Sequence, residues 1–176
     1  MRLFQVKVEF QSGEDRLLLR LASEDDNEVL LWLTRRVARY LWQLLIDMAQ
    51  SAPEIQLQAN PEARHALLGF KHEAALSQAN FEDMYDELPR DYPLGREPLL
   101  VCRLEKKRDD AGQHVLGLFP VDGQGIYLTL DDALLHGLVK LLENGVNKAD
   151  WALDLRMRRY NLLPIHIDGE GHPTLN

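Results

Sequence analysis

The sequence predicts an α+β fold of two antiparallel three-stranded meanders, each followed by a helix, with an additional middle helix and a C-terminal strand. Short segments with strand patterns occur in two groups of three, at residues 3–33 and 99–130. Turn-forming residues separate the segments within each group. A helical pattern follows each group, at residues 35–50 and about 130–145. Because consecutive strands joined by short turns most simply pair antiparallel, each group predicts a meander.

The first meander is predicted by two kinds of strand pattern. Apolar and polar residues alternate at Phe4–Phe10 and Leu17–Leu21, which indicates half-buried strands. A continuous apolar run at Val29–Leu33 indicates a third strand. Turn-forming residues at 12–15 and 24–27 separate these segments.

The helix predicted at 35–50 is apolar around most of its circumference. Thr34 is a suitable N-cap for it. With one residue every 100° or so, most of its polar side chains gather within about 80° of arc. Such a helix must be covered on more than one side. It is therefore either the central helix of the domain or a subunit interface, and it leads us to predict a homodimer.

A further helix and a long acidic connection lie between the two units. Asn60–Glu62 is a strong helix start, with a capping Asn, Pro at the first position and an acid in the first turn. The helix is predicted to continue to about Ala79. Phe81–Pro98 is rich in proline and acidic residues and is longer than most loops of compact domains. We expect Tyr85 and Tyr92 to hold this connection on the surface and to form a candidate partner loop.

The second unit has the same order of elements as the first. Its strands are predicted at Leu99–Leu104, His114–Phe119 and Ile126–Leu130. Thr129 and Asp132 form a capping box at the start of a helix, and Gly145 is a suitable residue to end it. Alternation from Trp151 to Arg158 predicts one more strand.

The two units share the order of their elements but not their amino-acid sequences. Aligning the strands and aligning the helices require different shifts, so an internal duplication and a coincidence of similar units both stay open. We expect residues 1–176 to form a single domain. Its two halves would be residues 1–50 and 99–160, joined by the helix at 61–79 and the acidic connection at 80–98.

Composition and charge exclude several classes of protein. The chain has 20 basic and 28 acidic residues and a net charge of −8, so as a whole it repels nucleic acid and anionic membranes. A locally basic face in either half is compatible with this total. Charges at Lys7 and Glu9 interrupt the apolar run that a signal peptide needs, so we expect a cytoplasmic protein without membrane contact. The single cysteine, Cys102, excludes an internal disulfide and a cysteine-based zinc site.

The known catalytic motifs are missing from the sequence. It contains neither the Gly-x-Ser-x-Gly turn of a nucleophilic serine nor a glycine-rich phosphate loop. Cys102 lies in an apolar strand, where a thiol behaves as a small hydrophobe. We name no catalytic residue and expect neither a metal nor a cofactor. Enzymatic activity stays open, with absence favoured.

Three arginines occupy the first turns of the helix at 35–50. At this end the helix dipole disfavours the cations of Arg35, Arg36 and Arg39 by about 0.3–1 kcal/mol each. Either acidic residues of the chain, at 24–28 or 82–91, compensate them, or they bind the phosphate or carboxylate of a ligand or nucleic acid. Local acids are plentiful, so we favour the internal partners.

A second basic cluster lies near the C-terminus. It consists of Arg156, Arg158 and Arg159 beside Tyr160, and two of these arginines would share one face of a strand. Cations beside an aromatic on a sheet are typical of proteins that bind single-stranded nucleic acid. A charged, solvated strand face is the simpler interpretation.

These observations favour a non-catalytic cytoplasmic binding or adaptor protein that acts through protein–protein contacts. Its partner is unknown, and a second copy of the chain is the first candidate. The alternative is a single-stranded nucleic-acid-binding protein that uses sheet faces and the arginine clusters. A second alternative is an enzyme whose site carries no recognised motif.

Overall fold

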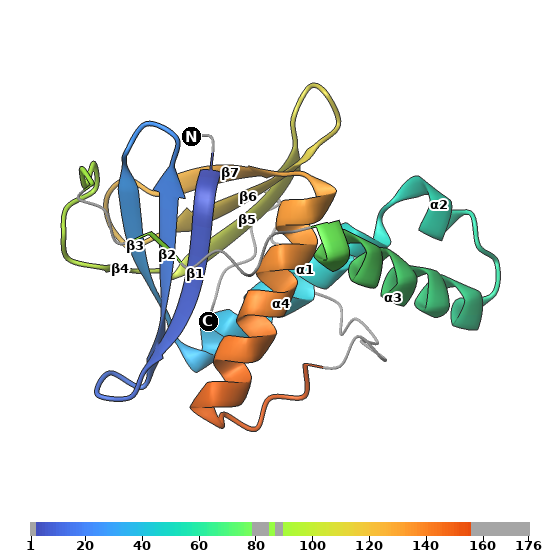
Figure 1. Ribbon diagram of the computed structural model, residues 1–176, viewed down its shortest axis with the longest axis horizontal. Coiled ribbons are helices and arrows are strands. Elements are labelled where there is room, and N and C mark those ends of the chain that lie inside the picture. Colours follow the sequence, from blue (N-terminus) through green and yellow to red (C-terminus); the bar gives the residue numbers. More distant parts are fainter. Residues whose placement is uncertain (1–2, 79–84, 87–89, 156–176) are drawn as a thin grey trace.

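The computed structural model describes residues 3–78, 85–86 and 90–155. Its elements confirm the α+β fold with strand–strand–strand–helix units in both halves (Figure 1). In chain order they are β1 (Leu3–Gln11), β2 (Arg16–Ser23), β3 (Glu28–Leu33), α1 (Arg35–Gln50), α2 (Pro53–Gln56), α3 (Pro61–Gln78), β4 (Leu99–Leu100), β5 (Arg103–Arg108), β6 (His114–Phe119), β7 (Ile126–Leu130) and α4 (Asp132–Ala149).

The strands form two sheets with the order of strands that the meanders predict. In the first sheet β1, β2 and β3 pair antiparallel, and β4 adds to β3 in parallel. In the second sheet β5, β6 and β7 pair antiparallel. Val8, Leu19 and Leu31 are cross-strand neighbours in the first sheet, and Leu19 and Leu31 are buried. One face of each meander therefore faces the core.

The strand predicted at Leu99–Leu104 is divided between the two sheets. Leu99–Leu100 pairs with β3, and the Val101 amide still donates to the carbonyl of Trp32 at 3.0 Å. The next amide, of Cys102, donates to the carbonyl of Phe119 in the second sheet at 2.8 Å. A single extended segment thus joins the edges of both sheets, which alternation within the sequence does not reveal.

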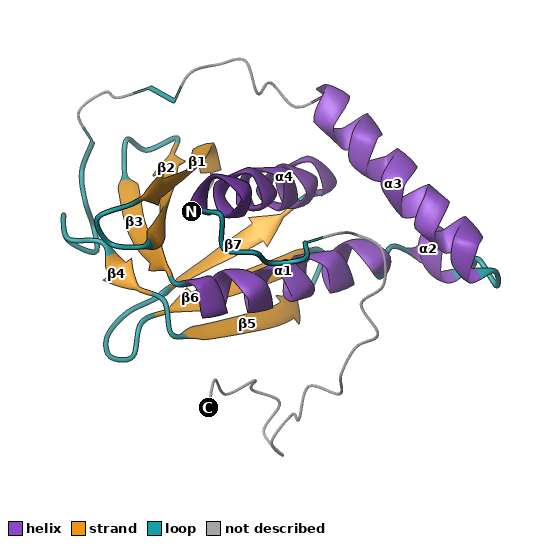
Figure 2. Ribbon diagram, turned by 90° about the horizontal axis from the view of Figure 1, so that it is seen from below, coloured by secondary structure: helices purple, strands orange, loops and turns teal. Residues whose placement is uncertain are grey.

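The helices α1 and α4 each contact the sheet of the other unit. Figure 2 shows α4 alongside β1 and β2, and α1 alongside β5 and β6. From α1, Asp47 forms an ion pair with Lys106 of β5, and Ser51, just after the helix, hydrogen-bonds His114 of β6. Thr34 caps α1 as predicted, its Oγ1 accepting from the Val37 amide at 3.2 Å.

The apolar circumference of α1 is covered within the chain. Trp42 and Leu45 are fully buried and belong to one core cluster that contains residues of both sheets and of α4. The first of the two alternatives for this helix, a central helix of the domain, is therefore the one observed. The reason for which the sequence predicted a homodimer through this helix no longer holds.

Two predictions about α4 were wrong. Its N-cap is Asp131 and not Thr129, because the Asp131 side chain accepts from the Leu134 amide at 2.7 Å. The helix continues through Gly145 to Ala149. Gly145 instead allows close packing on β1, since a Cβ there would lie 2.8 Å from the Cγ1 of Val8.

The predicted C-terminal strand is not formed over residues 151–155, and the rest of it lies outside the described residues. Asp150 and Ala152 have φ angles of 50° and 51°, which are incompatible with an extended strand. Trp151 is buried, its indole N–H donating to the Asp15 carboxylate at 2.8 Å and its ring meeting Phe10 edge-on. Residues 151–155 thus contribute the Trp151 side chain to the core and do not join a sheet.

The helices α2 and α3, residues 53–78, form an arm that projects from the two sheets (Figure 1). The sequence did not predict α2. The helix α3 begins as predicted, because the side chain of Asn60 accepts from the Glu62 amide at 2.8 Å. Of the side chains of residues 61–77, Leu68 alone is buried, so the arm is attached through a narrow contact.

Candidate binding surfaces

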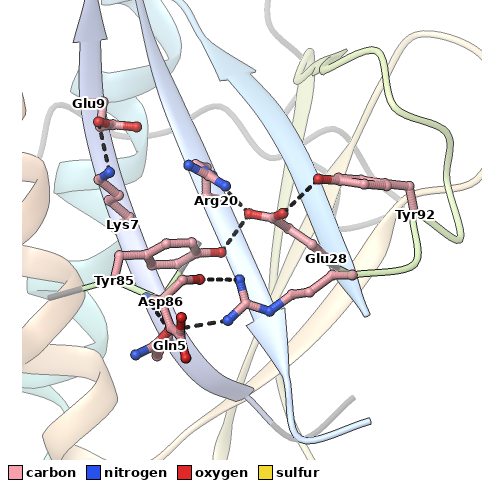
Figure 3. Close-up of polar contacts among 9 residues, drawn as sticks. Gln5, Lys7, Glu9, Arg20, Glu28, Tyr85, Asp86 and Tyr92 are labelled. Carbon is pink, nitrogen blue, oxygen red and sulfur yellow. Dashed lines mark hydrogen bonds and ion pairs between the residues drawn. The ribbon is translucent and has the colours of Figure 1, made fainter. Parts of the chain in front are cut away.

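A buried carboxylate organises the surface of the first sheet (Figure 3). Glu28 lies at the start of β3 and is 1% exposed. Its Oε1 accepts from the Arg20 Nε at 2.8 Å and from the Tyr85 hydroxyl at 2.6 Å. Its Oε2 accepts from the Tyr92 hydroxyl at 3.0 Å. Both tyrosines of the candidate partner loop therefore use their hydroxyl groups inside the chain.

These donors decide the charge of the cluster. Burial alone would raise the pKa of Glu28, but the hydrogen bonds from Arg20, Tyr85 and Tyr92 lower it below its ordinary value. Burial, followed by the hydrogen bond to Glu28, raises the pKa of Tyr85. The tyrosine consequently keeps its proton as a donor, and the carboxylate keeps its negative charge.

Backbone contacts hold the same segment on the sheet. The Glu28 amide donates to the carbonyl of Asp91 at 2.8 Å, and the Asp91 amide donates to the carbonyl of Asp26 at 2.9 Å. Arg90 is buried and donates to the carbonyl of Asp86 and to the side chain of Gln5. The connection is held down by its tyrosines as expected, and these two residues act as anchors for it.

The arginine cluster at the start of α1 points to solvent. Arg35, Arg36 and Arg39 are exposed, and none forms an ion pair with an acid among the residues that the structure describes. Arg39 lies 5.1 Å from the ring centroid of Tyr40. The favoured interpretation, compensation by acids of the chain, finds no partner in the described segments. Glu28, the best-buried acid of the expected group, is bound to Arg20.

Replacing Arg35, Arg36 and Arg39 together by alanine is therefore expected to leave the melting temperature unchanged or to raise it. Three cations leave the positive end of a helix dipole, which relieves about 0.3–1 kcal/mol each. Thermal unfolding followed by circular dichroism measures this. Loss of several degrees would instead show that the three arginines have partners that stabilise the fold.

The second basic cluster of the sequence, Arg156, Arg158, Arg159 and Tyr160, lies outside the described residues.

A cavity of about 280 Å³, lined by both polar and apolar side chains, lies where the arm meets the second sheet and α4. Lys71, Arg108, His114 and His136 are among the residues that line it. The Nε2 of His114 is 3.1 Å from the Oγ of Ser51, a pairing that resembles a nucleophile with its base. The Ser51 hydroxyl, however, donates to the carbonyl of Met48 at 2.7 Å, so its proton is already engaged. This geometry does not activate Ser51.

Two histidines face each other beside this cavity. The Nδ1 of His72 on α3 is 3.1 Å from the Nδ1 of His136 on α4. Burial, followed by the neighbouring His72, lowers the pKa of His136 to about 4, and burial also lowers the pKa of His72. Both are neutral at pH 7, so one donates a hydrogen bond to the other. Among the described residues, no group of three side chains is arranged to hold a metal ion.

The arm exposes large apolar side chains. Leu57, between α2 and α3, is 83% exposed, and Phe70 of α3 is 69% exposed. No helix in the described segments combines the length and apolar character needed to cross a membrane.

A further surface, absent from the sequence-based candidates, is the outer side of the second sheet. We call Arg103, Lys107, Phe119 and Tyr127 the aromatic face. The signal that marks it is alternation: on β5 these cations alternate with the buried Leu104, and on β7 Tyr127 precedes the buried Leu128. The apolar residues of these strands predicted the buried side of the sheet, and the exposed residues that alternate with them were not considered as a site.

Comparison with known proteins gives no relative. No protein-family model, curated protein or solved structure matches this chain. Its function therefore has to be argued from the surfaces described above.

Proposed function

We propose that this chain is a non-catalytic cytoplasmic binding protein that acts through protein–protein contacts, and that the α2–α3 arm is its docking surface. The observation that carries the proposal is the exposure of Leu57 and Phe70 on the α2–α3 arm, which buries few of its described side chains. Exposed apolar surface of a folded chain marks candidate interaction sites, and the arm carries two of the most exposed large apolar side chains among the described residues.

The energetics of α3 support this assignment. Helices in proteins owe most of their stability to the packing of an apolar face and little to intrinsic helix propensity. The face of α3 that contacts the body holds the buried Leu68, the half-buried Leu67 and the polar Lys71 and His72. A helix attached in this way gains stability when a second surface covers its remaining apolar residues.

The exposed Phe70 belongs to a stripe of half-buried apolar residues along one side of the helix, of which Leu67 also packs against the core. Ala63, Leu67, Phe70 and Ala74 are spaced by four, three and four residues, which places them on neighbouring turns. An amphipathic helix is recognised through anchors of this spacing. The spacing of these residues is the same in both directions along the helix. An antiparallel copy of α3 would therefore place Leu67 opposite the partner's Phe70. A two-fold interface requires such self-complementarity.

A second copy of this chain is thus the partner that we propose first, with α3 in place of α1 as the interface. Light scattering of the full chain at micromolar concentration is expected to report about twice the chain mass of 20.2 kDa. Replacing Phe70 by glutamate is expected to weaken association about 30-fold or more, as for a hot-spot residue worth about 2 kcal/mol.

Val121→Glu is the matched control, since Val121 is also highly exposed but lies in a turn of the second unit. This variant is expected to associate like the unchanged chain. A monomer at every accessible concentration, or equal weakening by both substitutions, would contradict the assignment of α3 as a self-association surface.

A further inference from the structure

The outer side of the second sheet carries an ordered cluster of rings and cations. Cross-strand pairing aligns Arg103 with Phe119, and aligns Glu105 with Gly117 and Tyr127. Since side chains alternate along strands, these residues lie on the side opposite to Leu104 and Leu128, which are buried in the core. This side of the sheet is therefore available to a ligand, and Tyr127 is 43% exposed.

Each ring of the aromatic face has a cation above it. The guanidinium carbon of Arg103 lies 4.2 Å from the ring centroid of Phe119, and the Nζ of Lys107 lies 3.6 Å from that of Tyr127. The two ring centroids are 5.1 Å apart, with the rings at 77° to each other. Two π surfaces and two cations thus occupy adjoining positions on three strands.

Glycine fixes the position of both rings. A Cβ on Gly117 would lie 2.6 Å from the Cε2 of Phe119 and 2.9 Å from the Cε1 of Tyr127, so the rings fit against bare backbone. A Cβ on Gly125 would lie 2.3 Å from the Cδ1 of Phe119. The Tyr127 hydroxyl donates to Glu105 at 2.6 Å, and Glu105 also pairs with Arg103. The rings are held in place before any ligand arrives.

We propose that the aromatic face binds single-stranded nucleic acid. Aromatic side chains on a sheet stack unpaired bases whatever their sequence, and neighbouring cations take the phosphates. In this arrangement Tyr127 and Phe119 stack two bases, while Arg103 and Lys107 turn from the rings toward the backbone. Protein interfaces are enriched in aromatic residues and arginine but depleted in lysine, so the placement of Lys107 against the Tyr127 ring favours a polyanion over a protein partner.

The charge of the chain sets the strength of this interaction. A net charge of −8 opposes a polyanion, and Glu105 lies within the cluster. Binding is therefore expected to be weak and to involve few phosphates. With two cations engaged, the logarithm of the association constant should fall against the logarithm of salt concentration with a slope of about −1.4, at about −0.7 per phosphate of a single strand.

Fluorescence anisotropy of a labelled twelve-nucleotide oligothymidylate, titrated with the full chain at several salt concentrations, tests this proposal. Tyr127→Ala is expected to weaken binding about tenfold or more through loss of stacking, while Tyr127→Phe keeps the ring and most of the affinity. Lys107→Ala is expected to make the salt slope shallower by about 0.7. Leu100→Ala, which removes an exposed apolar side chain from β4 of the first sheet, is the control and should bind as the unchanged chain does.

Unlabelled duplex of the same sequence is expected to compete poorly, because its bases are not free to stack. Circular dichroism shows whether each variant is folded. No binding at low salt would overturn the proposal, and so would equal affinity of the Tyr127→Ala variant and the unchanged chain. Loss of binding on replacing Arg35 and Arg36, with Tyr127→Ala unaffected, would also overturn it by placing the nucleic acid at the start of α1.

Discussion

Replacing Glu28 by alanine is expected to lower the free energy of unfolding by about 3–5 kcal/mol, the range for removing one partner of a buried ion pair. The substitution leaves the Arg20 guanidinium without its carboxylate and deprives the hydroxyl groups of Tyr85 and Tyr92 of their acceptor. The Glu28 carboxylate stabilises the burial of these groups because it accepts from all three. Urea denaturation measures the change as a lower midpoint with an unchanged slope.

Glu9→Ala is the matched control for this variant. Glu9 pairs with Lys7 on the same sheet, but both side chains are about one-third exposed, so its loss should cost about 0–1 kcal/mol. Glu28→Gln retains the shape of the side chain without its charge. Its free energy of unfolding should lie between those of the Glu28→Ala and Glu9→Ala variants. A Glu28→Ala variant as stable as the Glu9→Ala variant would show that the cluster contributes little to the fold.

The same substitution should release the segment that the tyrosines anchor. Arg90 is buried and hydrogen-bonded beside the cluster, which protects its peptide bond from trypsin. Limited proteolysis is therefore expected to cut the Glu28→Ala variant at Arg90 faster than the Glu9→Ala variant. This comparison separates loss of anchoring from a general loss of charge on the sheet.

Local patterns predicted most elements of this fold and few of its tertiary contacts. Alternation and capping residues found the strands of both meanders and the starts of α1 and α3, because these signals depend on neighbours in the chain. Gly145 was taken for a helix end because glycine is common there, whereas its actual role depends on Val8, which lies far away in the sequence. The crossing of Val101 between the sheets depends likewise on both sheet edges.

In the candidate sites, too, local patterns predicted individual residues but not their tertiary contacts. The tyrosines were correctly expected to hold the acidic connection, but their acceptor, Glu28, looked like one of several acids in a turn. Its burial follows from pairing with Arg20 across two strands, which no local pattern displays. The aromatic face was not predicted because the contact between Phe119 and Tyr127 depends on the register of β6 and β7. Patterns within one strand do not give that register.

Lowering the pH from 7.5 to 5 is expected to destabilise the protein through the histidine pair that joins α3 to α4. His136 is 2% exposed, and its pKa is about 4 in the folded chain, below the ordinary value of 6.5. The unfolded chain therefore binds more protons in this range, and stability falls as the pH falls. The loss begins near pH 6.5 and reaches its full size below pH 4.

The magnitude follows from the same two pKa values. A lowering of this size corresponds to a full penalty of about 3 kcal/mol, of which about 2 kcal/mol is already lost at pH 5. Protonation of both rings would place two cations 3.1 Å apart at the base of the arm. Charges around the pair act in both directions, the acids favouring protonation and the lysines opposing it: Glu73, Asp132, Glu143, Lys71 and Lys140.

Urea denaturation at intervals between pH 7.5 and 5 separates this pair from the other titrating groups. His136→Gln is expected to flatten the dependence of the unfolding free energy on pH, whatever its own stability at pH 7.5. His65→Gln, the same change at a histidine of α3 that is not part of the pair, is the control and should leave the slope unaltered. His114, whose pKa is also lowered by burial, accounts for a residual slope in both variants. The pKa of Glu28 is lowered from 4.5, so the pH dependence that its cluster contributes begins near pH 5 and is common to both histidine variants. Equal slopes in the His136→Gln variant and the unchanged chain would mean that the facing imidazoles do not govern how firmly the arm is attached.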